Sequence, residues 1–235
     1  MNLPNISKNR NTLSDHAYHV IRGAIVTLQL EPGQLVFESE LGSTLGVSRT
    51  PIREAFRRLM TEELIEILPQ RGARIAYMSK KKIEEARFVR VSLEVSAFKE
   101  AARKWNANDA AFEKGYQQIK GILEEHRKII DEQNFDRFLE LDESFHSAVL
   151  ELTGNSTLIS IINQMRGHLN RMRYLELLET KHMKQLVSEH EAIFEAITVN
   201  DEEKTERLLR EHITSLEYCT PDLIKKYSHY FQSVE

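Results

Sequence analysis

The chain has 235 residues, of which 41% are hydrophobic and 29% are charged, a composition that supports a folded core and excludes a disordered chain. Residues 1–82 contain 12 Lys and Arg against 8 Asp and Glu, whereas the remaining residues contain 20 against 28, so a basic N-terminal part suited to phosphate contact precedes an acidic remainder. The single cysteine, Cys219, excludes an intramolecular disulfide framework, and with no apolar signal segment or membrane-length run we expect a soluble, cytoplasmic protein.

The N-terminal part predicts two helices before a short break. Residues 1–12 are polar, and we expect them to be mobile. From Ser14 or Asp15, apolar residues recur at helical spacing, which predicts an amphipathic helix that ends before the Pro32-Gly33 turn. Residues 38–45 predict a second, supporting helix.

A third helix follows the Gly46-Val47 break, and its two faces differ. Ser48 is expected to cap this helix, and Pro51 is tolerated because it falls in the first turn. Arg49 stands at the exposed leading end. Helical spacing separates an apolar face from a polar face. The apolar face contains Ile52, Ala55, Phe56 and Leu59, and the polar face contains Thr50, Arg53 and Arg57. Such a helix suits insertion into a major groove of DNA.

Two short strands are predicted after this helix, at residues 65–68 and 73–77. The turn between them places Arg71 at a tip beside the flexible Gly72. The pattern is a helix-turn-helix followed by a β-wing. We therefore expect DNA contacts from six residues, which are Ser48, Arg49, Thr50, Arg53, Arg71 and Gly72.

The motif residues resemble a known DNA-binding family. Residues 46–55 read Gly-Val-Ser-Arg-Thr-Pro-Ile-Arg-Glu-Ala, and residues 69–73 read Pro-Gln-Arg-Gly-Ala. With residues 41–45 they resemble the winged-helix domain of the GntR family of bacterial transcription regulators. A helical hairpin with a solvated basic face would explain the arginines, but not the cap, the turn and the wing in register.

The composition changes after the wing and predicts an all-α bundle. No proline occurs between Gln70 and Thr220, and four glycines lie beyond Gly72. We expect a mainly α protein with a winged helix-turn-helix domain at 1–78 and an all-helical domain at 79–235. The helices are expected near 80–104, 108–132, 134–152, 156–178, 182–199 and 201–218. Pro221 is expected to end the last helix.

Polar residues stand at inward positions of this bundle. Asp142 and His146 share the face of one helix, while His190 and His212 lie within the apolar stripes of two later helices. A buried carboxylate needs a partner, a proton or a metal. One carboxylate with three imidazoles suits a divalent metal, most of all zinc, with nickel or manganese possible. Any one of these histidines could instead be a hydrogen-bonded core residue.

The same four residues resemble the metal ligands of the FCD effector domain of the FadR subfamily. The resemblance implies that they bind a metal and that the pocket takes a small carboxylate effector. Arginine suits such a ligand because its guanidinium binds carboxylates bidentately. The candidate effector-binding residues are Arg90, Glu94, Arg166 and Arg173; a structural Arg90–Glu94 pair and salt-bridge roles for the other two are the alternatives. His168 also faces inward as a spare ligand.

The sequence leaves three functions to weigh: an enzyme, a metal-independent regulator and a ligand-responsive regulator. The motif Glu143-x-x-His146 with Glu179-x-x-His182 is reminiscent of di-iron enzymes, but Glu143 points away from the stripe of Asp142 and Glu179 falls in an expected interhelix loop. A metal-independent regulator with structural histidines is the second alternative. We expect a ligand-responsive transcription regulator rather than an enzyme. It should be a repressor that binds a palindromic operator as a homodimer, since one recognition helix reads too few base pairs.

Overall fold

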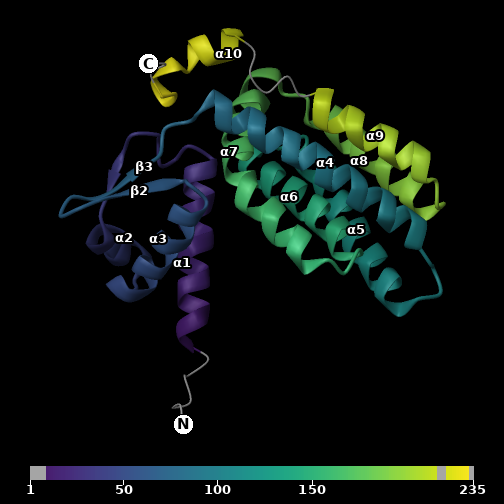
Figure 1. Cartoon of the computed structure of the whole chain (residues 1–235), viewed down its shortest axis with the longest axis horizontal. Coiled ribbons are helices and arrows are strands. Elements are labelled where there is room, and N and C mark those ends of the chain that lie inside the picture. The colour runs from purple at the N-terminus through teal and green to yellow at the C-terminus, as the bar shows by residue number, and fades with distance from the viewer. Residues whose placement is uncertain (1–8, 216–220, 233–235) are drawn as a thin grey trace. The chain divides into compact units, whose positions relative to one another are not determined.

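The protein divides into two units. The computed structural model describes residues 9–215 and 221–232. The first unit contains the described residues up to Ser79 together with those from Tyr227, and the second is Lys80–Lys226. The sequence predicts that all residues from 79 onward lie in the second domain, whereas the C-terminal segment from Tyr227 belongs to the first unit. Figure 1 shows the small sheet of the first unit and the long helices of the second.

The first unit combines three helices with a small antiparallel sheet. In chain order its elements up to residue 75 are α1 (Asn9–Val26), β1 (Leu35–Val36), α2 (Glu38–Leu45), α3 (Arg49–Thr61), β2 (Ile65–Leu68) and β3 (Gly72–Ile75). The strand order is β1-β3-β2. The predicted helix-turn-helix and wing are therefore present, while the two-residue strand β1 was not predicted.

Local chemistry explains the turns of this unit. Gly46 ends α2 with a φ of 67°, a left-handed conformation that glycine adopts without steric cost. Gly72 begins β3 with a φ of 83°, and a Cβ there would lie 2.6 Å from the backbone oxygen of Val36. In register, Ile65 pairs with Ile75. The core between helices and sheet is formed by Ala17, Tyr18, Ile21, Ile25, Val36, Ile52, Ala55, Phe56, Leu59, Leu64, Ile65, Ala73 and Ile75.

The second unit is a helical bundle. Its described helices are α4 (Lys80–Lys104), α5 (Ala110–Ile129), α6 (Phe135–Glu151), α7 (Ser156–Thr180), α8 (Met183–Thr198), α9 (Glu202–Ser215) and α10 (Pro221–Lys226). The side chains of Asp109, Asn134 and Asn155 accept hydrogen bonds from the first turns of α5, α6 and α7, so the polar breaks seen in the sequence are helix caps. Phe98, Phe145 and Ile197 are among the fully buried residues that hold the bundle together.

Several predicted boundaries were wrong. Helix α1 begins at Asn9 rather than at Ser14. Pro221 begins a further helix, α10, which was not predicted, as suits a residue whose missing N–H is harmless in a first turn; the end of the helix before it lies outside the described residues. Glu179 lies within α7 rather than in a loop. The expected helix at 201–218 begins at Glu202 as α9, and its expected end lies in residues 216–220, outside the described residues. Across the described helices, none is both long and apolar enough to cross a membrane.

The C-terminal segment pairs with the residue that follows the wing. A 3-10 turn at Ser228–Tyr230 leads to Phe231, which forms a parallel bridge with Met78. The Met78 N–H donates to the Tyr230 carbonyl at 2.8 Å, and the Gln232 N–H donates to the Met78 carbonyl at 2.9 Å. The Tyr230 hydroxyl also donates to Glu31 at 3.1 Å. These bonds join the last described residues to the first unit.

Candidate functional site

The polar face of α3 is open to solvent. Arg49, Thr50 and Arg53 are exposed, while the aliphatic side chains of the opposite face are buried. Arg53 donates through Nη2 to Oε2 of Glu38 at 2.8 Å and through Nε to Oε1 at 3.1 Å. This exposed pair adds little stability but gives the guanidinium a defined orientation. Sequence reasoning missed Glu38, which begins α2.

Ser48 stands at the N-cap of α3 but makes no side-chain cap hydrogen bond, so the predicted capping role is wrong. The position still matters. The first turn of a helix carries N–H groups without helical partners and the positive end of the helix dipole, which together attract phosphate. Ser48 and Arg49 therefore mark an anion-attracting end of α3.

The wing presents Arg71 at its turn. Arg71 is exposed and its N–H donates to the Leu68 carbonyl at 3.0 Å. Gly72 next to it is needed by the backbone, because its positive φ and its approach to β1 leave no room for a side chain. The structure thus places all six predicted DNA-contacting residues on α3, at its start or on the wing.

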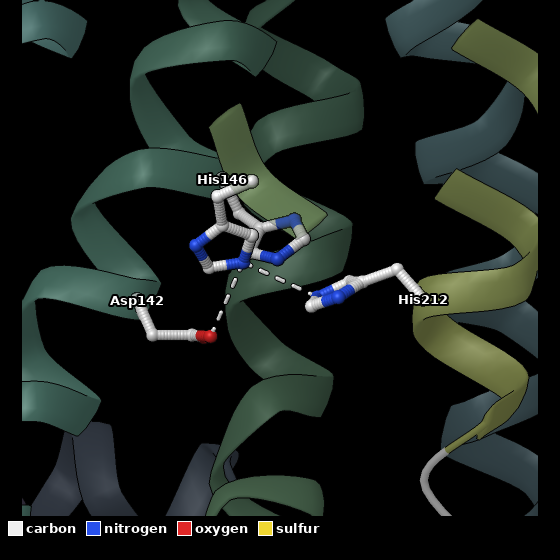
Figure 2. A group of neighbouring side chains, drawn as sticks. Asp142, His146 and His212 are labelled. Carbon is white, nitrogen blue, oxygen red and sulfur yellow. Dashed lines mark hydrogen bonds and ion pairs between the residues drawn. The ribbon is translucent and has the colours of Figure 1, made fainter. Parts of the chain in front are cut away.

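The four predicted metal ligands converge inside the bundle. Asp142 and His146 extend from α6, His190 from α8 and His212 from α9, and each is buried. One ligand atom from each residue lies within 4.8 Å of the others. Figure 2 shows Asp142, His146 and His212 turned toward one another.

The spacing of these atoms suits a shared ion. His190 Nε2 lies 3.2 Å from His212 Nε2 and 3.5 Å from Asp142 Oδ1. Two nitrogens bound to one tetrahedral zinc ion are about 3.3 Å apart, given Zn–N distances of about 2.0–2.1 Å. Burial holds the pKa of His146 down at about 3 and also lowers that of His190, so both imidazoles are neutral and able to bind a metal. The donor set fits a divalent ion.

Asp142 also has a protein partner. Arg173 on α7 donates through Nη1 to Oδ2 and through Nη2 to Oδ1, at 2.5 Å each. Burial would raise the pKa of Asp142, but Arg173, His146 and His190 together hold it well below its ordinary value. The carboxylate is therefore already neutralised, so its burial alone does not require a metal. Because each carboxylate oxygen has two lone pairs, Oδ1 can still coordinate an ion.

A second buried carboxylate adjoins the histidines. On α4, Glu94 Oε1 accepts from Arg90 Nε at 3.0 Å, and its Oε2 lies 2.9 Å from His146 Nδ1. Arg166 Nη2 on α7 is 3.5 Å from Glu94 Oε1 and has no hydrogen-bond partner among the described residues. Burial would raise the pKa of Glu94, but Arg90, His146 and Arg166 hold it well below its ordinary range. All four predicted effector residues therefore border the histidine cluster.

Sequence reasoning missed two neighbours of the cluster. His126 on α5 is fully buried, and its ring centre lies 5.6 Å from that of His190. Its position in the apolar stripe of α5 could have indicated from the sequence that it faces inward. Glu189 lies 2.7 Å from His212 Nδ1, a contact between helices that no spacing reveals. His168, the predicted spare ligand, instead accepts a hydrogen bond at Nδ1 from Arg171 Nη2 at 3.2 Å and is not in the cluster.

Comparisons with known proteins agree with both halves of the chain. Residues 13–75 match the family model described as bacterial regulatory proteins, gntR family, and residues 85–215 match the FCD domain model. The chain is 26% identical to the HTH-type transcriptional repressor RspR of Escherichia coli (strain K12) over 219 residues, which cover 93% of both proteins. It is 25% identical over 208 residues to the gluconate operon transcriptional repressor of Bacillus licheniformis, covering 86% of this chain and 83% of that protein.

Solved structures share the fold. E. coli McbR/YncC matches with a TM-score of 0.77 at 18% sequence identity, over 92% of this chain and 98% of that one. The structural match shows a common architecture, a winged N-terminal unit with a helical C-terminal unit. At this low sequence identity it carries no statement about ligands.

Proposed function

The chain belongs to the gntR family of bacterial regulatory proteins and carries an FCD domain, and from that membership we propose that it is a repressor that binds an operator as a homodimer and responds to a small carboxylate. Relatives in this family are transcription regulators, not enzymes. The observation that carries the proposal is the pairing of an exposed arginine-bearing helix with a buried Asp-His cluster in one chain.

DNA recognition is assigned to α3. Arg49, Thr50 and Arg53 would contact base edges in the major groove, since arginine binds guanine bidentately and threonine contacts either hydrogen-bonding edges or the thymine methyl. Ser48 and Arg71 would contact the backbone or the minor groove. One such helix covers a half-site, so two copies related by a two-fold axis would read a palindrome. Sedimentation of a monomer at micromolar concentration, bound singly to DNA, would contradict the dimer.

Effector binding is assigned to the histidine cluster and its arginines. Asp142, His146, His190 and His212 would hold one divalent ion, most readily zinc. Such an ion acts as a Lewis acid toward a carboxylate oxygen. Arg166 supports an anionic ligand because its Nη2 is a buried donor that finds no hydrogen-bond partner within the described part of the chain. A relative named for a gluconate operon, and hence for a small carboxylate, is consistent with that class.

The buried arginines favour the same ligand class. Arg90, Arg166 and Arg173 are all buried beside the cluster, and a guanidinium can bind a carboxylate through two parallel hydrogen bonds.

Metal analysis and melting test this proposal. Purified wild type should contain one divalent ion per chain, while His190→Ala and His212→Ala should lose it and show no rise in melting temperature on metal addition. Full loading of both variants, or a wild type that binds no divalent ion after careful purification, would contradict the metal site. The second candidate function is a metal-independent regulator. It is favoured by the Asp142–Arg173 ion pair, and it would replace the metal-dependent proposal if that result were obtained.

A further inference from the structure

A hydrogen bond across two helices links the histidine cluster to an acidic side chain nearer the surface. We propose that Glu189, on α8, is a positioning residue for the metal site, because it fixes the ring of His212 with Nε2 turned toward the other ligands. The inference rests on the proposed function, since it presupposes that the cluster binds a divalent ion.

The geometry of the pair defines which nitrogen carries the proton. His212 Nδ1 lies 2.7 Å from Glu189 Oε2. An ionised carboxylate can only accept hydrogen bonds, so Nδ1 donates and carries the hydrogen. In a neutral imidazole the other nitrogen is then an unprotonated acceptor. His212 Nε2 faces His190 Nε2 at 3.2 Å, so its lone pair points toward the other proposed ligands.

The three histidines are held in different ways. His146 Nδ1 lies 2.9 Å from Glu94, which is itself fully buried. His190 has no hydrogen-bond partner at Nδ1 among the described residues, but its ring stacks on Phe145 with 4.2 Å between centres. His212 comes from the last turn of α9 and is the sole ligand from that helix among the four. The hydrogen bond that His212 donates to Glu189 ties its orientation to α8.

Glu189 is in turn oriented from the surface. Gln185, one helical turn earlier, donates through Nε2 to Glu189 Oε1 at 2.9 Å. Together they form a chain of contacts from solvent to ligand, Gln185 to Glu189 to His212. A cleft of about 260 Å³ opens beside it, lined by Gln185, Ser188, Glu189, Ala192, Leu208, Glu211 and His212. His212 lies at the wall of this cleft, with its side chain buried.

Zinc affinity of three proteins tests the role. Wild type, Glu189→Gln and Glu195→Gln are titrated with Zn²⁺ in competition with a chromophoric chelator. Glutamine keeps the size of Glu189 but can offer N–H to Nδ1, which favours the wrong tautomer. Loss of an outer-sphere partner of this kind weakens metal binding by about 10–100-fold, and we expect that loss for Glu189→Gln. Glu195 is exposed on the same helix, so Glu195→Gln removes the same charge and should bind zinc as wild type does.

Two further readouts separate positioning from folding. Without zinc, Glu189→Gln should melt close to Glu195→Gln, whereas its zinc-induced rise in melting temperature should be smaller. Nitrogen-15 spectra of zinc-free protein should show His212 protonated on Nδ1 in wild type and shifted toward Nε2 in Glu189→Gln.

Three results would overturn the proposal. Equal zinc affinity of Glu189→Gln and wild type would remove the positioning role while leaving the metal site intact. Equal losses in Glu189→Gln and Glu195→Gln would show a general effect of charge. Absence of zinc, nickel and manganese binding in wild type would remove the metal site itself, and this inference with it.

Discussion

Arg173 is the built-in counter-charge of Asp142, so replacing it with methionine should destabilise the helical unit. Both guanidinium Nη atoms donate to the carboxylate at 2.5 Å, and both side chains are buried. Breaking a buried ion pair on one side costs about 3–5 kcal/mol, because an uncompensated charge is left behind. In a unit of about 150 residues each kcal/mol lowers the melting temperature by about 2–4 °C. Arg173→Met should therefore melt roughly 6–20 °C below wild type in chelator.

Zinc and a double variant make this experiment decisive. A divalent ion would take over the neutralisation of Asp142, so zinc should raise the melting temperature of Arg173→Met more than that of wild type. The variant that combines Asp142→Asn with Arg173→Met removes both charges; it should regain most of the zinc-free stability and lose the zinc response. A loss below about 1 kcal/mol in Arg173→Met would refute the reasoning, since Asp142 would then be neutralised by other means, such as a proton.

Three other predictions concern DNA, pH and the backbone. Arg53→Ala should weaken binding to the operator roughly 10- to 100-fold and binding to random DNA far less; equal losses on both DNAs would show that Arg53 contacts only phosphate. Glu38→Gln should strengthen binding to random DNA and reduce discrimination between operator and random DNA. The pKa of His146 is 6.5 unfolded and about 3 folded, so its contribution is complete above pH 6.5. This contribution to the free energy of unfolding should decrease by roughly 1 kcal/mol for each pH unit as the pH falls toward 3. The urea midpoints of zinc-free protein at several pH values would measure the decrease. Gly72→Ala should destabilise the wing by about 1–3 kcal/mol, whereas Gly121→Ala, with no atom within 4 Å, should stabilise its helix by up to about 1 kcal/mol.

Periodicity predicted the elements and the faces of the helices. The exposed Thr50 and Arg53 follow from spacing along one helix, and so does the inward place of Asp142 and of His146 one turn later. A polar residue in an apolar stripe is visible in the sequence because burial of such groups is rare. These signals alone identify Asp142, His146, His190 and His212 as one candidate cluster.

Contacts between distant segments were not predictable in this way. Arg173 meets Asp142 across 31 residues of sequence, and Glu189 meets His212 across 23. Spacing along one helix says which face a side chain occupies, but not which residue of another helix it meets. The residue type of Ser48 predicted its N-cap position correctly but not the hydrogen bond, since Ser48 makes no side-chain cap hydrogen bond.

The C-terminal segment has a consequence for the order in which the protein is made. Because residues from Tyr227 belong to the same unit as α1 and the wing, the helical unit is an insertion within the first unit. The ribosome must synthesise all of Lys80–Lys226 before Tyr230 can bond to Met78 and Glu31. At about 5–20 residues per second this takes roughly 7–30 s. The DNA-reading unit, whose motif is translated first, is therefore the last to be completed.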